Sequence, residues 1–208
     1  DDEHSFISEQ VDGKPFIRTI YQASKNIPEI AELFNEKITH LLKNYYSSGN
    51  FSILHVDCRR HYHVPSEIDP TLELFGVRWH CDKRPTDQIK LFVYLSDVTE
   101  DDGPFHAIPL NRTRDLMKMG FDSPMDYKID EKFLEDPSQL VKVTGTTGTA
   151  FFGNANLLLH KAGNPAKDHT RDVISISIQS SKTLSKELFK NVEPIGAEKR
   201  EIKRRMSK

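Results

Sequence analysis

The chain is poor in cysteine and in long apolar runs, and each shortage excludes a class of protein. Its 208 residues contain only Cys58 and Cys81, too few for the disulfide framework of a small secreted domain. No apolar run approaches the roughly 20 residues that a transmembrane helix needs, and no signal-peptide pattern opens the chain. The sequence therefore favours a cytoplasmic protein with no membrane partner.

The chain also lacks an excess of charge of either sign. Its 29 Lys and Arg nearly balance its 31 Asp and Glu, which gives a net charge of -2. A chain this close to neutrality has no bulk electrostatic attraction to nucleic acid or to a membrane surface. We expect a small-molecule partner and no nucleic acid, and the oligomeric state stays undetermined.

The N-terminal region has the pattern of a helix. From residue 26 to residue 46, apolar side chains recur at helical spacing, and Pro28 suits the first turn of a helix. We assign residues 1–50 to a helical segment that packs on the rest of the domain. The sequence begins with Asp1 rather than Met, which indicates that the natural chain continues beyond this end.

From residue 51 the pattern changes to short runs rich in Val, Ile, Phe and Tyr, separated by Pro, Gly and Asp. Such runs are typical of strands. The expected strands cover residues 51–57, 74–82, 88–97, 104–109, 139–144, 148–153 and 171–179. Short strands at this spacing predict a mainly β fold with flanking helices, a double-stranded β-helix (jelly roll) over residues 51–181.

Two regions stand outside this strand pattern. Residues 110–136 are polar and mixed, and we expect an insertion there with short helices near 114–119 and 130–134. Residues 182–208 are expected to hold a last helix at 182–191, followed by a highly charged tail with little apolar content. A tail of that composition favours a frayed or disordered end.

The segment 78–82, Arg-Trp-His-Cys-Asp, contains the clearest metal-binding pattern. Side chains two positions apart on a strand point to the same face, so His80 and Asp82 can hold one cation together. A later histidine, His160, can supply the third ligand. Two imidazoles and one carboxylate on one side of a metal form the facial triad of non-haem Fe(II) oxygenases, which leaves the other positions open.

A second pair of the same type, His55 and Asp57, competes with this interpretation. It also lies on an expected strand, with Phe51 and Ile53 on the same face as His55. The further motifs that follow His80 in the sequence are not found around His55 and Asp57. We therefore interpret His55 as a hydrogen-bonded strand histidine.

A third cluster permits a cupin-type site. His61, His63 and Glu67 resemble the His-x-His pair and the Glu of cupins, and His160 can complete that set. The glycines that should frame such a site are missing, and Pro65 interrupts the segment. In the plainer interpretation, His61 and His63 belong to a polar loop near the substrate.

Several motifs, taken in order, resemble one known family. They are the segment Trp79–Asp82, the strand Leu91–Val98, the turn Gly103-Pro104-Phe105, the segment Gly148–Asn154, the segment His160–Pro165 and Arg171. Their order and spacing over residues 74–179 are similar to the phytanoyl-CoA dioxygenase family, a branch of the Fe(II)- and 2-oxoglutarate-dependent oxygenases. The resemblance implies a jelly-roll fold and the cofactors Fe(II), 2-oxoglutarate and dioxygen.

The resemblance also implies a role for each site residue. His80, Asp82 and His160 would bind Fe(II), which 2-oxoglutarate would chelate through its 2-oxo and C1 carboxylate groups. Arg171 would bind the far carboxylate, because a planar guanidinium can form two parallel hydrogen bonds with it. Further hydrogen bonds to the cosubstrate could come from Lys90, Tyr94 and Ser175.

Strand alternation predicts the surroundings of Arg171. Ser175 shares its face, whereas Ile174, Ile176 and Ile178 lie on the other face, which we expect to pack against helices.

The expected reaction is hydroxylation of a small polar or anionic metabolite, with release of succinate and CO2. The resemblance favours hydroxylation because related halogenases replace the carboxylate of Asp82 with a small residue. Arg78 shares the face of His80 and Asp82 on a regular strand, and a buried cation needs an anionic partner. The candidates for substrate contacts are Arg78, Trp79, Arg84 and Arg112.

The sequence departs from the family at residues 108–112, Ile-Pro-Leu-Asn-Arg, where many members read Ile-Pro-Gly-Ser-His. The chain is also short for the family, which favours a small substrate over an acyl-CoA. Two alternatives stay open. One is a cupin-type metal enzyme that uses His61, His63 and Glu67 without 2-oxoglutarate, and the other is a non-catalytic jelly-roll binding protein.

Overall fold

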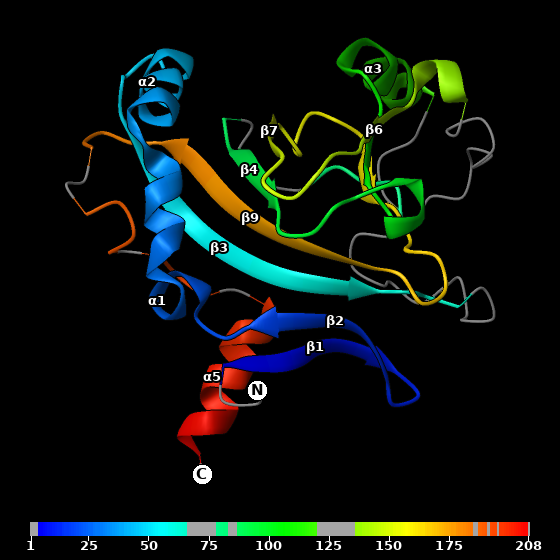
Figure 1. Cartoon of the computed structure of the whole chain (residues 1–208). Helices are drawn as coiled ribbons and strands as arrows, with labels where there is room; N and C mark the ends of the chain where they lie inside the picture. The colour runs from blue at the N-terminus through cyan, green and yellow to red at the C-terminus, as the bar shows by residue number, and fades with distance from the viewer. Residues whose placement is uncertain are drawn as a thin grey trace.

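The computed structural model describes residues 4–65, 78–82, 87–119, 136–184, 187–190, 192–194 and 196–207. Two sheets and several outer helices make up these parts of the chain (Figure 1). The strands are β1 (Ser5–Val11), β2 (Lys14–Ile20), β3 (Phe51–Tyr62), β4 (Ile89–Tyr94), β5 (Phe105–Ala107), β6 (Val141–Val143), β7 (Ala150–Gly153), β8 (His160–Ala162) and β9 (Thr170–Ser180). The helices are α1 (Ala23–Asn26), η1 (Pro28–Phe34), α2 (Glu36–Tyr45), η2 (Glu100–Asp102), α3 (Leu110–Lys118), η3 (Pro137–Gln139) and α5 (Gly196–Met206). Within these described parts, no helix has the length and apolar character needed to cross a membrane.

Two antiparallel sheets form the jelly roll. The larger has six strands in the order β1-β2-β3-β9-β4-β7, and the smaller has the order β6-β5-β8. The longest pairing joins β3 to β9, from Phe51 opposite Ser180 to Tyr62 opposite Thr170. An isolated bridge between His80 and His160 adds to the edge of the smaller sheet at β8. The predicted jelly roll is confirmed.

One face of the larger sheet carries the main core. Ile174, Ile176 and Ile178 of β9 are buried there among residues of the outer helices, including Phe34 of η1 and Leu42 of α2. Figure 1 shows α1 and α2 beside the sheet near β3 and β9. Full burial of one such aliphatic side chain contributes about 1.5–3 kcal/mol. The expectation that the Ile face of β9 packs against helices is confirmed.

A bulge in β3 decides which of its residues face this core. The register of β3 with β9 shifts between Ile53 and His55. Phe51 and Ile53 lie in the core before the shift, and Val56 and Cys58 lie in it afterwards. The prediction that His55 shares a face with Phe51 and Ile53 is wrong, because one extra residue reverses the alternation of side chains.

The N-terminal region begins with strands rather than with the helical segment predicted for residues 1–50. β1 and β2 form a hairpin around Asp12 and Gly13, whose φ angles are 49° and 76°. A two-residue turn with positive φ at both positions is the turn that an Asp-Gly pair favours. The larger sheet therefore gains two strands beyond the predicted domain.

The helix predicted over residues 26–46 is present as three shorter helices, α1, η1 and α2. Asn35 is extended, and its side chain accepts a hydrogen bond from the N–H of Ile38 over 3.0 Å. This N-cap ends one helix and begins the next. The apolar spacing correctly predicts helical structure in this region, but it does not predict the N-cap at Asn35 that divides the region into separate helices.

The C-terminal region also departs from the prediction. The described residues within 182–191 form turns, and the charged tail forms the helix α5. The N–H of Gln22 donates to Glu198 Oε1 over 2.6 Å, and the guanidinium of Arg205 lies 4.5 Å from the centre of the Tyr21 ring. The prediction of a frayed tail is wrong, because these charged side chains bind the N-terminal part of the fold.

Most of the other predicted strands are present but shorter, as β4, β5, β6 and β7. The strand predicted over 74–82 is reduced, within the described residues 78–82, to the bridge at His80, and β8 was not predicted. The helix predicted near 114–119 is present as the longer α3. The helix predicted at 130–134 lies outside the described residues.

Candidate metal centre

Backbone pairing brings His80 and His160 together. The N–H of His80 donates to the carbonyl of His160 over 3.0 Å, and the reverse bond measures 2.9 Å. Residues directly opposite each other in an antiparallel pair place their side chains on the same face. Asp82 is held beside them because its N–H donates to the carbonyl of Ala155 over 2.8 Å. All three side chains therefore reach the same space.

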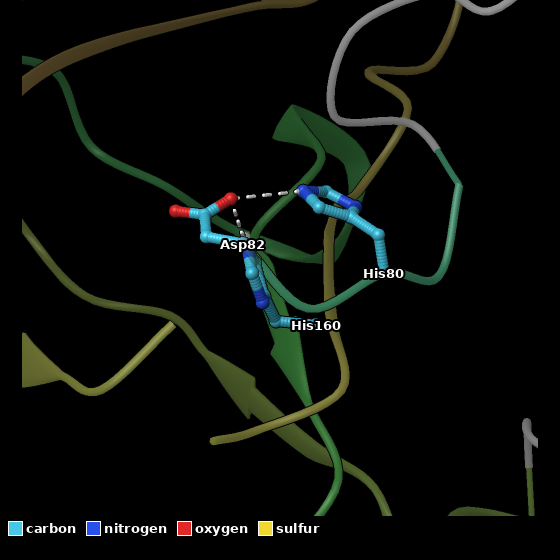
Figure 2. A group of neighbouring side chains, drawn as sticks. All are labelled: His80, Asp82 and His160. Atoms are coloured by element: carbon cyan, nitrogen blue, oxygen red, sulfur yellow. Dashed lines mark ion pairs between the residues drawn. The ribbon is translucent and has the colours of Figure 1, made fainter. Parts of the chain in front are cut away.

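The three side chains converge on one point, as Figure 2 shows. Asp82 Oδ1 lies 3.6 Å from His80 Nε2 and 3.9 Å from His160 Nε2. One ligand atom from each residue lies within 4.8 Å of the others. Metal–ligand bonds of about 2.1 Å place neighbouring ligand atoms roughly 3–4 Å apart, so this spacing suits a single ion.

Each imidazole is oriented by a backbone carbonyl two residues earlier. His80 Nδ1 lies 2.6 Å from the carbonyl of Arg78, and His160 Nδ1 lies 2.9 Å from that of Leu158. A carbonyl oxygen only accepts, so each Nδ1 carries a hydrogen, and in the neutral ring the lone pair is then on Nε2. That tautomer is the one that binds a metal through Nε2.

The charges of the site suit a cation. Burial raises the pKa of Asp82, but the contacts with His80 and Lys90 outweigh burial and hold that pKa well below its usual value. Lys90 Nζ donates to Asp82 Oδ2 over 2.5 Å. Burial, together with the neighbouring His80, lowers the pKa of His160 to about 4. An ionised carboxylate and a neutral imidazole are the forms that coordinate metal ions.

A cavity of about 540 Å³ lies beside these three residues. Its apolar wall is a group of contacting rings, Phe92, Phe105 and Phe151, with centroids 5.0–5.5 Å apart. Phe105 also stacks on the His160 ring at 5.5 Å. The volume falls in the range of small-molecule sites.

Arg171 enters the same cavity from β9 and is 4 % exposed. Its guanidinium donates to the carbonyl of Gly103, while its Nε has no hydrogen-bond partner among the described residues. Burial lowers the pKa of Arg171 to about 10, so it remains a cation at neutral pH. None of the carboxylates in the described parts of the chain forms an ion pair with it.

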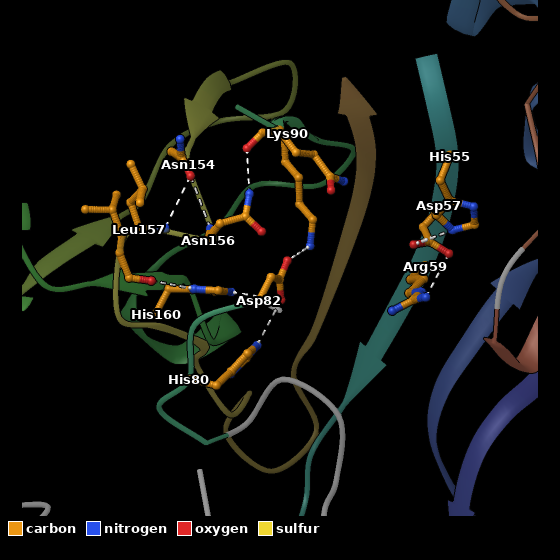
Figure 3. A network of polar contacts seen from close by, with 12 residues as sticks. His55, Asp57, Arg59, His80, Asp82, Lys90, Asn154, Asn156, Leu157 and His160 are labelled. Carbon is orange, nitrogen blue, oxygen red and sulfur yellow. Dashed lines mark hydrogen bonds and ion pairs between the residues drawn. The ribbon is translucent and has the colours of Figure 1, made fainter. Parts of the chain in front are cut away.

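The other predicted cosubstrate contacts also line the cavity. The hydroxyl of Tyr94 donates to the carbonyl of Val143 over 2.7 Å and accepts from the N–H of Phe105 over 3.1 Å. Ser175 lies opposite Phe92 in the sheet. Lys90 reaches the cavity from β4 but is directed at Asp82, as Figure 3 shows.

The family model described as phytanoyl-CoA dioxygenase (PhyH) matches residues 10–173, most of the chain. The chain belongs to the phytanoyl-CoA dioxygenase family. The resemblance inferred from the motifs is thereby confirmed, and so is the cofactor set expected for this family of Fe(II)- and 2-oxoglutarate-dependent oxygenases. No match was found among curated proteins.

Three solved structures illustrate the similarity of fold. The non-haem alpha-ketoglutarate-dependent epimerase SnoN from nogalamycin biosynthesis is 16% identical, with 85% of this chain and 67% of that chain covered and a TM-score of 0.57. HygX from Streptomyces hygroscopicus, solved with nickel, 2-oxoglutarate and hygromycin B, is 16% identical, with 91% and 84% covered and a TM-score of 0.54. EctD from S. alaskensis with bound Fe is 18% identical, with 95% and 71% covered and a TM-score of 0.54. At these identities the likeness establishes the shared fold.

Within this phytanoyl-CoA dioxygenase fold, the predicted substrate residues are placed differently from the cavity residues. Trp79 is 3 % exposed and packs with Ile108, Leu116 and Leu159. Trp79 is absent from the described lining of the cavity, so a substrate contact there stays a prediction.

The arginines expected near the substrate do not form a group at the cavity. Arg78 and Arg112 are absent from the described lining, and Arg78 instead supplies the carbonyl that orients His80. Arg112 lies on α3. Arg84 lies outside the described residues.

Sequence reasoning missed one wall of the cavity. His55, Asp57 and Arg59 line it from β3, next to His61, which was expected near the substrate. The signal that could have found them is the alternation of polar residues at 55, 57, 59 and 61, which is the pattern of a strand with one polar face.

Two residues of the cupin-type alternative, His61 and His63, lie in different surroundings. His61 lines the cavity beside Arg171, whereas His63 Nδ1 lies 2.7 Å from the carbonyl of Pro165. Glu67 lies outside the described residues. Among the described residues, the His, Cys, Asp and Glu side chains grouped closely enough for a metal ion are His80, Asp82 and His160.

Proposed function

We propose that this chain hydroxylates a small polar or anionic metabolite and releases succinate and CO2 from 2-oxoglutarate. The observation that carries the proposal is the buried cation Arg171, which shares a cavity with His80, Asp82 and His160. A buried guanidinium is unfavourable without an anion. Because no carboxylate of the described residues forms an ion pair with Arg171, an anionic cosubstrate would fit beside its guanidinium.

Each residue of the triad would have a distinct role in binding the metal ion. His80 and His160 hold Nε2 lone pairs toward the ion, and Asp82 contributes one negative charge. Lys90 binds the second carboxylate oxygen of Asp82 and thereby fixes the orientation of that ligand. Iron, 2-oxoglutarate and dioxygen together supply oxidative decarboxylation of the cosubstrate coupled to oxidation of the substrate.

Arg171 is proposed to bind the far carboxylate of 2-oxoglutarate. Its hydrogen bond to the Gly103 carbonyl fixes the guanidinium, and its planar donors match a carboxylate. Ser175 also lines the cavity and can donate to the cosubstrate, whereas the hydroxyl of Tyr94 already donates to the carbonyl of Val143. The rings of Phe92, Phe105 and Phe151 keep this part of the cavity apolar, which strengthens such charge pairs.

Two products test the proposal together. The protein is incubated in air with Fe(II), 2-oxoglutarate and a panel of small metabolites, and succinate and oxygenated products are measured by mass spectrometry. We expect succinate to rise with an accepted metabolite, that metabolite to gain one oxygen atom, and Asp82→Ala to abolish both. Succinate formed with a product that gains no oxygen would refute hydroxylation. Absence of succinate from correctly folded protein would favour the cupin-type enzyme or the non-catalytic binding protein.

A further inference from the structure

The larger sheet forms one side of the cavity, here called the floor, and the pairing of its strands orders the residues on it. Every second residue lines the cavity: His55, Asp57, Arg59 and His61 of β3, Arg171, Val173, Ser175 and Ser177 of β9, and Gln88, Lys90, Phe92 and Tyr94 along β4 and the residue before it. Arg171 pairs with His61 at one end of the floor. Ser177 pairs with His55 and Lys90 toward the other end. Between residues 171 and 177 an extended strand advances about 20 Å, so the two ends are well separated.

The triad lies across the cavity from the rows of Phe92 and Lys90. The ring of Phe92 contacts that of Phe105, which stacks on the ring of His160. Lys90 bonds to Asp82. The carbon chain of 2-oxoglutarate, at about 1.5 Å per bond, is only roughly 5–6 Å long. A cosubstrate held between the triad and Arg171 therefore leaves the opposite end of the floor for the primary substrate.

Gln88 is a buried polar side chain at that opposite end. It is 5 % exposed and lines the cavity, and its Oε1 has no hydrogen-bond partner among the described residues. Its backbone is fixed, because its carbonyl accepts from Asn156 Nδ2 over 2.7 Å. A buried amide oxygen without a partner is unfavourable, so a ligand that donates a hydrogen bond fits beside Gln88.

Ser177 adds a second buried polar group to the same end of the floor. It is 5 % exposed, lines the cavity and lies opposite Lys90, which is two residues from Gln88. A serine hydroxyl can both donate and accept a hydrogen bond. Gln88 and Ser177 together therefore offer a donor and acceptors without a charge.

The charged side chains near these two residues already contact one another. Lys90 Nζ donates to Asp82 Oδ2 over 2.5 Å. Asp57 Oδ1 accepts from Arg59 over 2.7 Å, and Asp57 Oδ2 lies 2.9 Å from His55 Nε2. Figure 3 shows the group on β3 on the other side of β9 from the triad. A neutral ligand group suits uncharged partners better than an ion does, because an ion loses more hydration free energy when it is buried.

We infer that Gln88 and Ser177 bind a hydroxyl group of the primary substrate, so that this substrate is a small neutral alcohol or polyol. The inference rests on the proposed function, because it names the class of polar metabolite that the same cavity takes. A hydroxyl can donate to the amide oxygen of Gln88 and accept from the hydroxyl of Ser177 at the same time. A carboxylate only accepts and an ammonium group only donates, so neither satisfies both residues.

The test measures binding to protein loaded with Zn(II) and saturating 2-oxoglutarate, so that no reaction occurs and the cosubstrate site is filled. Calorimetry first records the affinity for 2-oxoglutarate alone. The probes are matched pairs in which fluorine replaces one hydroxyl: benzyl alcohol and benzyl fluoride, cyclohexanol and fluorocyclohexane, and myo-inositol and its monodeoxyfluoro analogues. Benzoate and benzylammonium are the charged probes. We expect at least one alcohol to bind about tenfold or more tightly than its fluoride, because fluorine cannot donate to a buried acceptor.

Variants locate the preference for the hydroxyl. Gln88→Leu should abolish it, because leucine has a similar size and no polar atom. Ser177→Ala, a change on a different strand, should reduce it independently. The matched control is Gln10→Leu, because Gln10 is an exposed glutamine of β1 outside the described lining of the cavity. This control should keep both the preference and the affinity for 2-oxoglutarate.

The outcomes separate the inference from the proposed function. If wild-type protein binds 2-oxoglutarate but no alcohol more tightly than its fluoride, the inference is wrong and the proposed function stands. Tighter binding of benzoate or benzylammonium than of every alcohol also overturns the inference. So does a preference that survives in both Gln88→Leu and Ser177→Ala, or that Gln10→Leu removes equally. If wild-type protein fails to bind 2-oxoglutarate, the proposed function itself fails.

Discussion

Arg171 is held between the loop at Gly103 and the neighbouring strand β3. Its guanidinium donates to the carbonyl of Gly103, and on β3 its register partner is His61. Burial, with the nearby Arg171, lowers the pKa of His61 well below its usual value, so this imidazole is neutral beside the guanidinium. The cation is thus fixed in place while its charge remains available to a ligand.

Replacing Arg171 should weaken cosubstrate binding without affecting the metal. A hydrogen bond to a charged group is worth about 1.5–3 kcal/mol, so Arg171→Gln should weaken 2-oxoglutarate binding roughly tenfold to hundredfold. Calorimetry with Zn(II)-loaded protein measures this change, and a separate Zn(II) titration should be unaltered. Equal 2-oxoglutarate affinity in the variant and in wild type would remove Arg171 from the cosubstrate site.

Replacing Asp57 should destabilise the protein in a pH-dependent way. Asp57→Asn leaves the Arg59 guanidinium and the His55 ring without their anion, and breaking such a buried pair costs on the order of 3–5 kcal/mol. The folded-state pKa of His55 is raised, so its stabilisation is present below about 6.5, the ordinary histidine pKa, and is lost as pH rises through the folded value. The loss of stability in the variant should therefore be larger at pH 6 than at pH 9, as measured by urea unfolding.

The control for this experiment is the exposed pair of Arg60 with Asp172 on the same two strands. Asp172→Asn should cost less than about 1 kcal/mol, as surface pairs do, with no such dependence on pH. A pH-independent loss in Asp57→Asn would contradict the raised pKa of His55.

At the scale of elements, two loops cross beside Arg171. Gly103 has a φ of 67°, and a Cβ there would lie 2.5 Å from the carbonyl oxygen of Gly163 and 2.6 Å from the nitrogen of Pro165. A Cβ on Gly163 would meet the backbone of Gly103 and Pro104 just as closely. These glycines belong to the Gly103-Pro104 and His160–Pro165 motifs of the sequence, so the motifs mark a close backbone contact.

Gly103→Ala should therefore disturb both stability and the cosubstrate site. The substitution combines the penalty of a left-handed backbone, about 1–2 kcal/mol, with a clash against the backbone of the other loop. Because the Gly103 carbonyl accepts from Arg171, 2-oxoglutarate binding should weaken together with the unfolding free energy.

Gly148→Ala is the matched control for that variant. Gly148 also has a positive φ, 88°, but nothing lies within 4 Å of its Cβ position. Gly148→Ala should lower the free energy of unfolding by the backbone penalty alone and should leave 2-oxoglutarate binding unchanged. If thermal unfolding and calorimetry show equal losses of stability and of 2-oxoglutarate affinity in the two variants, then the close contact between the two loops does not explain the effect of Gly103→Ala.

Strand and helix limits were predictable where apolar periodicity is strong and were missed where single residues decide. The Ile face of β9 follows from alternation alone, and the structure confirms it. The hairpin at Asp12 and Gly13 depends on one turn, and the cap at Asn35 depends on one side chain. The bulge before His55 appears in the sequence only as a change from apolar side chains at 51 and 53 to polar ones from 55 on, and the register of β3 with β9 is needed to identify it.

At the scale of the whole molecule, the order of the motifs predicted the family, and the spacing of the strands together with that resemblance predicted the jelly roll. His80 and His160 are far apart in sequence and become register partners. His55, Asp57 and Arg59 could not be assigned to the cavity of the triad from the sequence, because their position depends on the pairing of β3 with β9. Nor could the helix α5, whose buried Glu198 and Glu201 are charged residues that composition alone assigns to solvent.

The most direct test of the central claim is an anaerobic titration of the protein with Fe(II) and then 2-oxoglutarate, followed by visible absorption. We expect a weak metal-to-ligand charge-transfer band that appears only when Fe(II) and 2-oxoglutarate are both present. The band should be absent from Asp82→Ala, and Arg171→Gln should need a higher concentration of 2-oxoglutarate to form it. Absence of the band from folded wild-type protein, or its persistence in Asp82→Ala, would contradict the assignment of His80, Asp82 and His160 as the metal centre.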